Sequence, residues 1–172
     1  GAVDALLLAR DDAPQHMAFA APFLAAGLPV YIDKPLALRE EEAVAVLALQ
    51  RYPTQLFSCS ALRYAPELLL PAGEWDSLGA LQMVDALIPK YWETYAVHLI
   101  EPVVAQLAAR GLLAPVAAHA AQRLGGTRCL ALALENGLHL RFSTLGSLPV
   151  PIALHFYGST GRYAKLFENS FQ

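Results

Sequence analysis

Three short apolar runs alternate with two segments of helical spacing in the first third of the chain, and this alternation constrains the fold most. The runs are VDALLLA (3–9), LPVYI (28–32) and TQLFSCSAL (54–62), and the helical segments are 13–27 and 39–52. Such a pattern is typical of parallel strands joined by right-handed helical crossovers. The sequence therefore predicts an α/β fold with a partial doubly wound, Rossmann-like parallel sheet.

The ends of the two helical segments carry further signals. Asp12 offers an N-cap for the first helix, and Gly27 lies where that helix should stop. Pro22 inside the segment favours a kink. Three glutamates at 40–42 open the second helix, where acidic side chains complement the helix dipole.

The pattern changes after residue 65. We expect a strand over 78–88, a helix over 94–111 and further strands within 114–124, 127–145 and 149–167, with hairpin-like turns at ENG and GSTG. These elements predict an α+β domain with a mostly antiparallel, open sheet and at least one covering helix. We place the domain boundary near RYAPE, which gives a first domain of residues 1–63 and a second of 64–172.

The composition excludes several classes of protein. Of the 172 residues 56% are apolar and 16% charged, which excludes disorder, and charges or prolines interrupt every run that could span a membrane. The net charge of −3 makes a nucleic acid an unexpected partner.

The two cysteines and the N-terminus bear on the compartment. Cys59 and Cys129 lie within apolar runs, as small buried residues of a reducing compartment do, although a disulfide between them stays open. The N-terminus shows no basic segment or cleavage site of a signal peptide. A cytoplasmic location is the expectation.

Polar residues follow the first two predicted strands directly. Arg10 begins RDD after the first strand, and Asp33, Lys34 and Pro35 follow the second. Ligands of parallel α/β sheets bind at the carboxyl ends of the strands. Lys34 could supply a positive charge or a proton there, or could be a lysine that extends into solvent at a strand end.

The predicted helix over 94–111 carries a second candidate. His98 has Thr94 four residues before it and Glu101 three residues after it, so the three side chains share one helix face. A histidine oriented by a carboxylate suits general acid–base catalysis, and the alternative is a core histidine. His16 could line the same cleft as Lys34 or cap its helix.

The remaining sequence features argue against other chemistries. Three histidines fall in alternating strand patterns without metal-ligand spacing, so we interpret them as sheet residues: His119, His139 and His155. The chain contains no G-x-S-x-G motif of serine hydrolases and no G-x-G-x-x-G loop for phosphate binding.

Four motifs in order give the chain a resemblance to a known family. VDALLLARDDAPQHMAFAAPFLAAGLPVYIDKPLA resembles the second half of the nucleotide-binding domain of the glucose–fructose oxidoreductase / inositol dehydrogenase family, with Asp33 in place of the Glu of its Glu-Lys-Pro signature. ALRYAPELL resembles its Arg-x-x-Pro segment through Arg63 and Pro66. AVHLIEPV resembles its histidine helix, and IALHFYGSTGRYAKL its Gly-x-x-Gly strand pair.

The resemblance implies an activity and a set of roles. Hydride would pass between NAD or NADP and a hydroxyl-bearing carbon of a sugar or polyol, with Lys34 and His98 as catalytic residues. The cofactor side would comprise Arg10, His16, Asp33 and Pro35. The substrate side would comprise Arg63, Thr94 and Glu101.

Two departures from the family pattern qualify these expectations. Thr94 replaces the family's acid four residues before the histidine, and the glycine-rich first half of the nucleotide-binding domain is missing. We therefore interpret the chain as an N-terminally truncated homologue that by itself binds no cofactor and is inactive. The alternative is a non-catalytic binding or dimerisation module. An exposed edge of the shortened sheet, or the antiparallel sheet, predicts a homo-oligomer.

Overall fold

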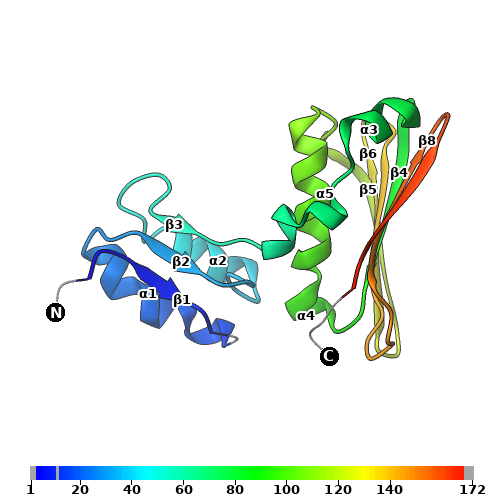
Figure 1. Cartoon of the computed structure of the whole chain (residues 1–172). Helices are drawn as coiled ribbons and strands as arrows, with labels where there is room; N and C mark the ends of the chain where they lie inside the picture. The colour runs from blue at the N-terminus through cyan, green and yellow to red at the C-terminus, as the bar shows by residue number, and fades with distance from the viewer. Residues whose placement is uncertain (1–2, 11, 169–172) are drawn as a thin grey trace. The chain divides into compact units, whose positions relative to one another are not determined.

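Two sheets form in separate parts of the chain, and each is described by itself. The computed structural model describes residues 3–10 and 12–168. The chain separates into unit 1, Gly1–Ser60, and unit 2, Ala61–Gln172 (Figure 1). No helix in the described residues is both long enough and apolar enough to cross a membrane.

Unit 1 is a three-stranded parallel sheet with strand order β1-β2-β3. The strands are β1 (Leu6–Leu8), β2 (Val30–Ile32) and β3 (Leu56–Phe57). Between them lie a short 3-10 turn η1 (Ala13–Gln15), helix α1 (His16–Ala25) and helix α2 (Glu40–Leu47). This arrangement confirms the β-α-β-α-β prediction and its parallel sheet.

The core of unit 1 lies between its two helices and one face of its sheet. It comprises Leu8, Ala20, Leu24, Val30, Ile32, Val46 and Leu56. The alternate strand residues form a row on the opposite face, with Leu7 beside Tyr31 and Tyr31 beside Phe57. Leu7 is 74% exposed and Phe57 49% exposed, so within unit 1 the helices cover only one face of the sheet.

Two local expectations for unit 1 are wrong. Asp12 makes no side-chain capping bond, because the η1 turn with Pro14 precedes α1 and the Asp12 carboxylate lies 3.9 Å from Arg10. The third strand spans two residues instead of 54–62, and residues 61–64 turn into a 3-10 helix. Gly27 follows the end of α1 as expected, with φ of +79°.

Unit 2 is built on a six-stranded mixed sheet with strand order β5-β6-β7-β4-β8-β9. The strands are β4 (Leu81–Ile88), β5 (Val116–Leu124), β6 (Thr127–Leu134), β7 (His139–Thr144), β8 (Ile152–Gly158) and β9 (Arg162–Phe167). All neighbouring pairs are antiparallel except β4 with β7, which are parallel. The predicted fold class, a partial parallel sheet followed by a mostly antiparallel one, is confirmed.

The helices of unit 2 cover one face of this sheet (Figure 1). They are η2 (Ala61–Tyr64), η3 (Pro66–Leu68), α3 (Ala72–Leu78), α4 (Trp92–Tyr95) and α5 (Val97–Ala109). Leu99, Val103 and Leu107 of α5 are fully buried against strand residues such as Phe142 and Phe156. The predicted helix over 94–111 is thus present as α4 and α5, whereas α3 has no counterpart among the sequence predictions.

The GSTG turn between β8 and β9 packs against the end of α3. The Thr160 N–H donates to the Leu78 carbonyl at 3.0 Å, and its hydroxyl donates to the Ser77 carbonyl at 2.9 Å. A Cβ added at Gly158 would lie 2.0 Å from the Leu78 carbonyl oxygen, which leaves no room for any side chain. The two glycines of this motif therefore allow a close approach of backbone to backbone.

Candidate functional site

The carboxyl edge of the unit 1 sheet brings together the predicted cofactor-side residues. Arg10 follows β1, while Asp33, Lys34 and Pro35 follow β2, and parallel strands end at the same edge. The Asp33 N–H donates to the Leu8 carbonyl at 2.9 Å, which fixes the start of the segment after β2. Lys34 is half-buried, and the Lys34–Pro35 peptide bond is cis.

His16 lies inside this edge instead of on its surface. Its side chain is completely buried at the first position of α1. Nε2 lies 2.9 Å from the carbonyl oxygen of Arg10, and Nδ1 lies 3.3 Å from that of Leu36. Direct cofactor contact by His16 stays a prediction, but its ring already has protein partners on both nitrogens.

Arg10 is an exposed cation at the carboxyl edge of the unit 1 sheet. Its guanidinium lies 4.9 Å from the centre of the Phe19 ring and 3.9 Å from the Asp12 carboxylate. Nearly half of the Arg10 side chain is accessible to solvent. The group can therefore meet an anionic ligand, as its predicted role requires.

The predicted substrate-side residues lie in unit 2. Thr94 is on α4, and His98 and Glu101 are on α5; all three are half-buried. The His98 ring lies 5.5 Å from the ring of Tyr95, with a tilt of 59° between the planes. Arg63 lies on η2, exposed, with its guanidinium 5.8 Å from the Tyr64 ring centre.

Lys34 and His98 belong to different units, so their joint action stays a prediction. Each has the local setting that its role requires: Lys34 a strand end and His98 a helix with a carboxylate one turn on. Glu93, the other carboxylate near Thr94, pairs with Arg128 of β6 at 2.6 Å. The Glu93 carboxylate therefore contacts the sheet of unit 2 through this ion pair.

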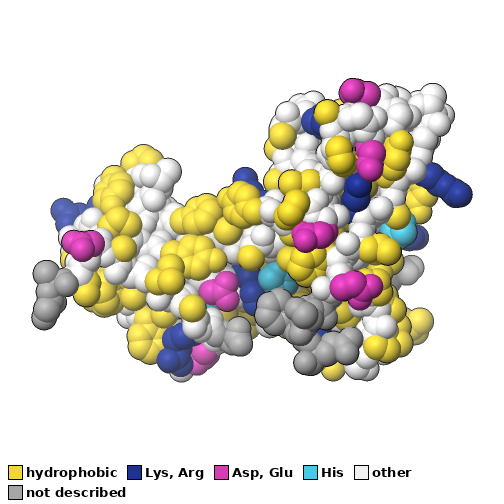
Figure 2. All heavy atoms as spheres, in the orientation of Figure 1, with side chains coloured by type: hydrophobic (Ala, Val, Ile, Leu, Met, Phe, Trp, Pro, Cys, Tyr) yellow, Lys and Arg dark blue, Asp and Glu magenta, His cyan; other side chains and the backbone are white. Residues whose placement is uncertain are grey.

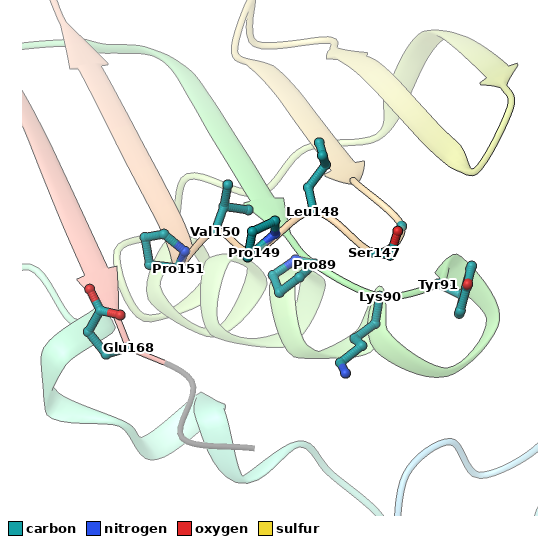
Figure 3. A pocket seen from close by; sticks show the side chains of 10 residues that line it. Pro89, Lys90, Tyr91, Ser147, Leu148, Pro149, Val150, Pro151 and Glu168 are labelled. Carbon is teal, nitrogen blue, oxygen red and sulfur yellow. The ribbon is translucent and has the colours of Figure 1, made fainter. Parts of the chain in front are cut away.

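Unit 2 also contains a cavity whose lining includes none of the predicted catalytic, cofactor-side or substrate-side residues. It measures about 440 Å³ and lies where β4 ends against the loop over 145–151 (Figure 3). Prolines form its middle, with Lys90 and Glu168 on either side of them. Lys90 adopts φ of +74°, and its backbone pairs with that of Gly146. Sequence reasoning did not single out this cavity.

Sequence reasoning also missed an ion pair on the open face of the unit 2 sheet, the face that α3 and α5 leave uncovered. Arg141 of β7 donates to both carboxylate oxygens of Asp85 of β4, at 2.7 and 2.5 Å. This hydrogen bonding raises the pKa of Arg141, against the opposing effect of partial burial. A single Asp in the apolar run LQMVDALI was the signal that could have found it.

No group of three or more His, Cys, Asp or Glu side chains that could hold a metal ion is present among residues 3–10 and 12–168. Cys59 is buried and Cys129 half-buried, and the two form no disulfide in that part of the chain.

Comparison with known proteins finds solved structures with a similar fold. No protein-family model matches the chain, and no curated protein matches it in sequence. Solved structures do match. Biliverdin reductase from Synechocystis sp. PCC 6803, in complex with biliverdin and NADP+, has 15% identity and a TM-score of 0.66 over 96% of this chain. GenD2 from gentamicin A biosynthesis, in complex with NAD, has 17% identity and a TM-score of 0.67 over 95%.

A third match is myo-inositol 2-dehydrogenase from Lactobacillus plantarum, with 16% identity and a TM-score of 0.66 over 95% of this chain. The chain spans 60%, 54% and 57% of the lengths of these three proteins. At such identities the likeness concerns the fold. The chain has the two-part α/β fold of inositol dehydrogenases and related oxidoreductases, and the family resemblance of its motifs is thereby confirmed at the level of fold.

Proposed function

We propose that this chain is part of a nicotinamide-dependent oxidoreductase that transfers hydride between NAD or NADP and a hydroxyl-bearing carbon of a sugar or polyol. One observation carries the proposal. At least 95% of the chain matches solved structures whose names include NAD and NADP+ complexes and an inositol dehydrogenase, and Lys34 follows a parallel strand at the edge where such folds bind ligands.

The chain's own residues fit one end of a dinucleotide. Arg10, Asp33 and Pro35 follow β1 and β2, and they could contact a ribose and a nicotinamide ring at that edge. Neither turn from strand to helix in unit 1 contains a glycine in its sequence, the residue that lets the backbone approach a pyrophosphate closely. Under the proposal, the pyrophosphate is bound by residues outside these two turns.

Two side chains would manage the proton of the reacting hydroxyl. Nε2 or Nδ1 of a neutral His98 can accept that proton while hydride leaves the carbon, and Glu101 one turn later can stabilise the resulting imidazolium. The Lys34 ammonium can donate a hydrogen bond to the same oxygen and so stabilise negative charge on it. The bound nicotinamide would accept the hydride.

Substitution of these two residues tests the proposal in a protein that joins this chain to a dinucleotide-binding segment. Lys34→Ala and His98→Ala are each expected to lower kcat by about 10²- to 10⁴-fold, because each removes a group that acts on the proton. Lys90→Ala and His139→Ala are matched controls that should keep turnover close to normal. Near-normal turnover of either test variant, measured by NAD(P)H absorbance on a panel of polyols, would overturn its assigned role.

The chain by itself is expected to bind NAD(H) and NADP(H) no more tightly than the millimolar range, because its strand-to-helix turns lack the glycine cradle. Calorimetric titration measures this. Micromolar affinity would contradict the expectation and would place the pyrophosphate on residues not identified above.

A second candidate function, a binding or dimerisation module, is favoured by the open face of the unit 2 sheet. One row across it runs Ala120, Ala131, Arg141, Asp85, His155 and Ala164 in register. The outer strand β5 is exposed along its whole length. The alanines of this row, around the paired Asp and Arg, would let another protein surface approach the sheet closely along it.

Light scattering with two variants tests which surface makes an oligomer. If the open face is the contact, Ala131→Arg should convert the oligomer to a monomer by adding a charge next to Arg141, whereas Leu7→Arg on the unit 1 sheet should not. The reverse result would assign the contact to unit 1. A monomer for the unsubstituted chain at high concentration would exclude both.

A further inference from the structure

His16 joins three segments of unit 1 through a single buried ring. The residue is fully buried and begins α1. Nε2 of the ring is hydrogen-bonded to the carbonyl oxygen of Arg10, which follows β1. Nδ1 lies within hydrogen-bond distance of the carbonyl oxygen of Leu36, which follows β2. The ring thus connects the two strand ends at the carboxyl edge of the sheet with the start of the helix.

The segment that carries Lys34 is attached on both sides. Before it, the Asp33 N–H donates to the Leu8 carbonyl at 2.9 Å. After it, the Leu36 carbonyl meets Nδ1 of His16 at 3.3 Å, and the Leu36 side chain packs on the core of unit 1. Lys34 and Pro35 lie between these two points, so the direction in which the lysine leaves the backbone depends on both.

Both partners of the ring are carbonyl oxygens, which only accept hydrogen bonds. His16 must therefore act as a donor, and a methyl-bearing or phenyl side chain of similar volume could fill the space without donating. A neutral imidazole carries one N–H, so it serves one of the two carbonyls at a time, whereas the doubly protonated ring serves both. The two bonds can be separated experimentally, because each involves a different nitrogen.

We infer that His16 is a positioning residue for Lys34: its hydrogen bond to Leu36 holds the backbone that aims the lysine. The inference rests on the proposed function only in that Lys34 is assigned a catalytic role there. The position of the lysine itself is a property of this chain, and it is measurable without cofactor or substrate.

Competitive acetylation of lysines, read by mass spectrometry, measures that position. The chain has three lysines, Lys34, Lys90 and Lys165, so the last two serve as internal references. His16→Phe fills the space and removes both donors. It should raise the labelling rate of Lys34 relative to Lys90 and Lys165 by roughly two- to tenfold, the factor expected for a lost hydrogen bond.

A second pair of variants distinguishes positioning from general stability. The Asn amide nitrogen of His16→Asn lies close to the Nδ1 position and can still donate to Leu36, so the labelling ratio should stay near that of the unsubstituted chain. The longer amide of His16→Gln reaches toward Arg10 instead, and the ratio should rise as it does in the Phe variant.

Gln55→Met provides the matched control. Gln55 is also buried and donates to the carbonyls of Leu24 and Leu28, at the other edge of the same sheet. Its loss should lower the stability of unit 1 without changing the labelling ratio of Lys34.

Three results would overturn the inference: an unchanged ratio in a folded His16→Phe variant, an equal rise in Gln55→Met, or equal ratios in the Asn and Gln variants. The last comparison decides the matter if the Phe variant does not fold. Loss of the proposed catalytic role, shown by normal turnover of Lys34→Ala, would leave the labelling result standing, so the two failures can be told apart.

Discussion

Unit 1 and unit 2 differ in how much structure supports their candidate residues. Among residues 3–10 and 12–60, the strands of unit 1 are two or three residues long, and seven buried hydrophobic residues make the core. Among the described residues of unit 2, which end at 168, the strands have six to nine residues and the core has seventeen. Lys34 therefore stands on a small scaffold where one hydrogen bond such as that of His16 matters, whereas α5 holds His98 against an extensive core.

The two sheets also differ in what they expose. Parallel sheets are usually covered on both faces, yet the row of Leu7, Tyr31 and Phe57 in unit 1 faces outward. Figure 2 shows hydrophobic side chains gathered at the surface of the unit 1 elements. The open face of unit 2 instead carries alanines around Asp85 and Arg141. An apolar open face in one unit and a small-residue polar one in the other suit different partners.

The largest expected effect is the loss of stability of unit 2 when Gly158 is replaced. Gly158→Ala should lower the free energy of unfolding of unit 2 by about 4 kcal/mol or more, because the new Cβ would collide with the Leu78 backbone carbonyl, which cannot move without shifting α3. Denaturant unfolding followed by the fluorescence of Trp75 and Trp92, which both lie in unit 2, measures it. Gly126→Ala, where a Cβ would meet nothing within 4 Å, is the control and should change stability by less than about 1 kcal/mol.

The next largest effect is the loss of stability when one leucine is removed from the hydrophobic core of either unit. Leu24 in unit 1 and Leu99 in unit 2 are both fully buried, and replacing either by Ala should cost about 2–5 kcal/mol. The smaller core of unit 1 has less stability to lose, so Leu24→Ala should unfold unit 1 while unit 2 stays folded. Hydrogen exchange measured peptide by peptide checks this. Equal protection of both units in the Leu24→Ala variant would show that unit 1 is as stable as unit 2.

The smallest expected effect is the loss of stability when an ion pair is removed from either unit. Asp85→Asn should destabilise unit 2 by about 1–2 kcal/mol, because the Asp85 side chain is only 10% exposed, and the amide loses the negative charge and keeps only one of the two oxygens that accept from Arg141. Arg39 and Glu42 in unit 1 form an exposed pair three residues apart, so Glu42→Gln should cost less than about 0.5 kcal/mol. Thermal melts of both variants measure the difference, and equal costs would contradict it.

Raising the pH should not destabilise unit 2 in the way that Asp85→Asn does. The pKa of Arg141 is raised in the folded state, so the stability from its charge is present below the unfolded-state pKa and is lost only as the pH rises through the higher folded-state value. Both values lie in the strongly basic range of arginine. Stability measured from neutral to moderately basic pH should therefore show no loss from Arg141.

Local patterns in the sequence were sufficient for most elements. Apolar runs and helical spacing predicted β1, α1, β2, α2 and the six later strands, β4 to β9, because period-2 and period-3.6 patterns are properties of neighbouring residues. Helix α3 was missed because its seven residues, AGEWDSL, include a glycine and show no repeat long enough to recognise. The third strand was predicted too long for a different reason, since an apolar run does not say where strand pairing ends.

The sequence by itself determined the order and type of most elements, the strand-end position of Lys34 and the one-turn spacing of His98 and Glu101 on a helix. Only the tertiary structure decided which strands pair, including the parallel pairing of β4 with β7. It also decided that His16 is buried between two carbonyls and that Gly158 must be a glycine. The physical reason is distance along the chain: each of these outcomes depends on residues that folding brings together, and no local pattern records them.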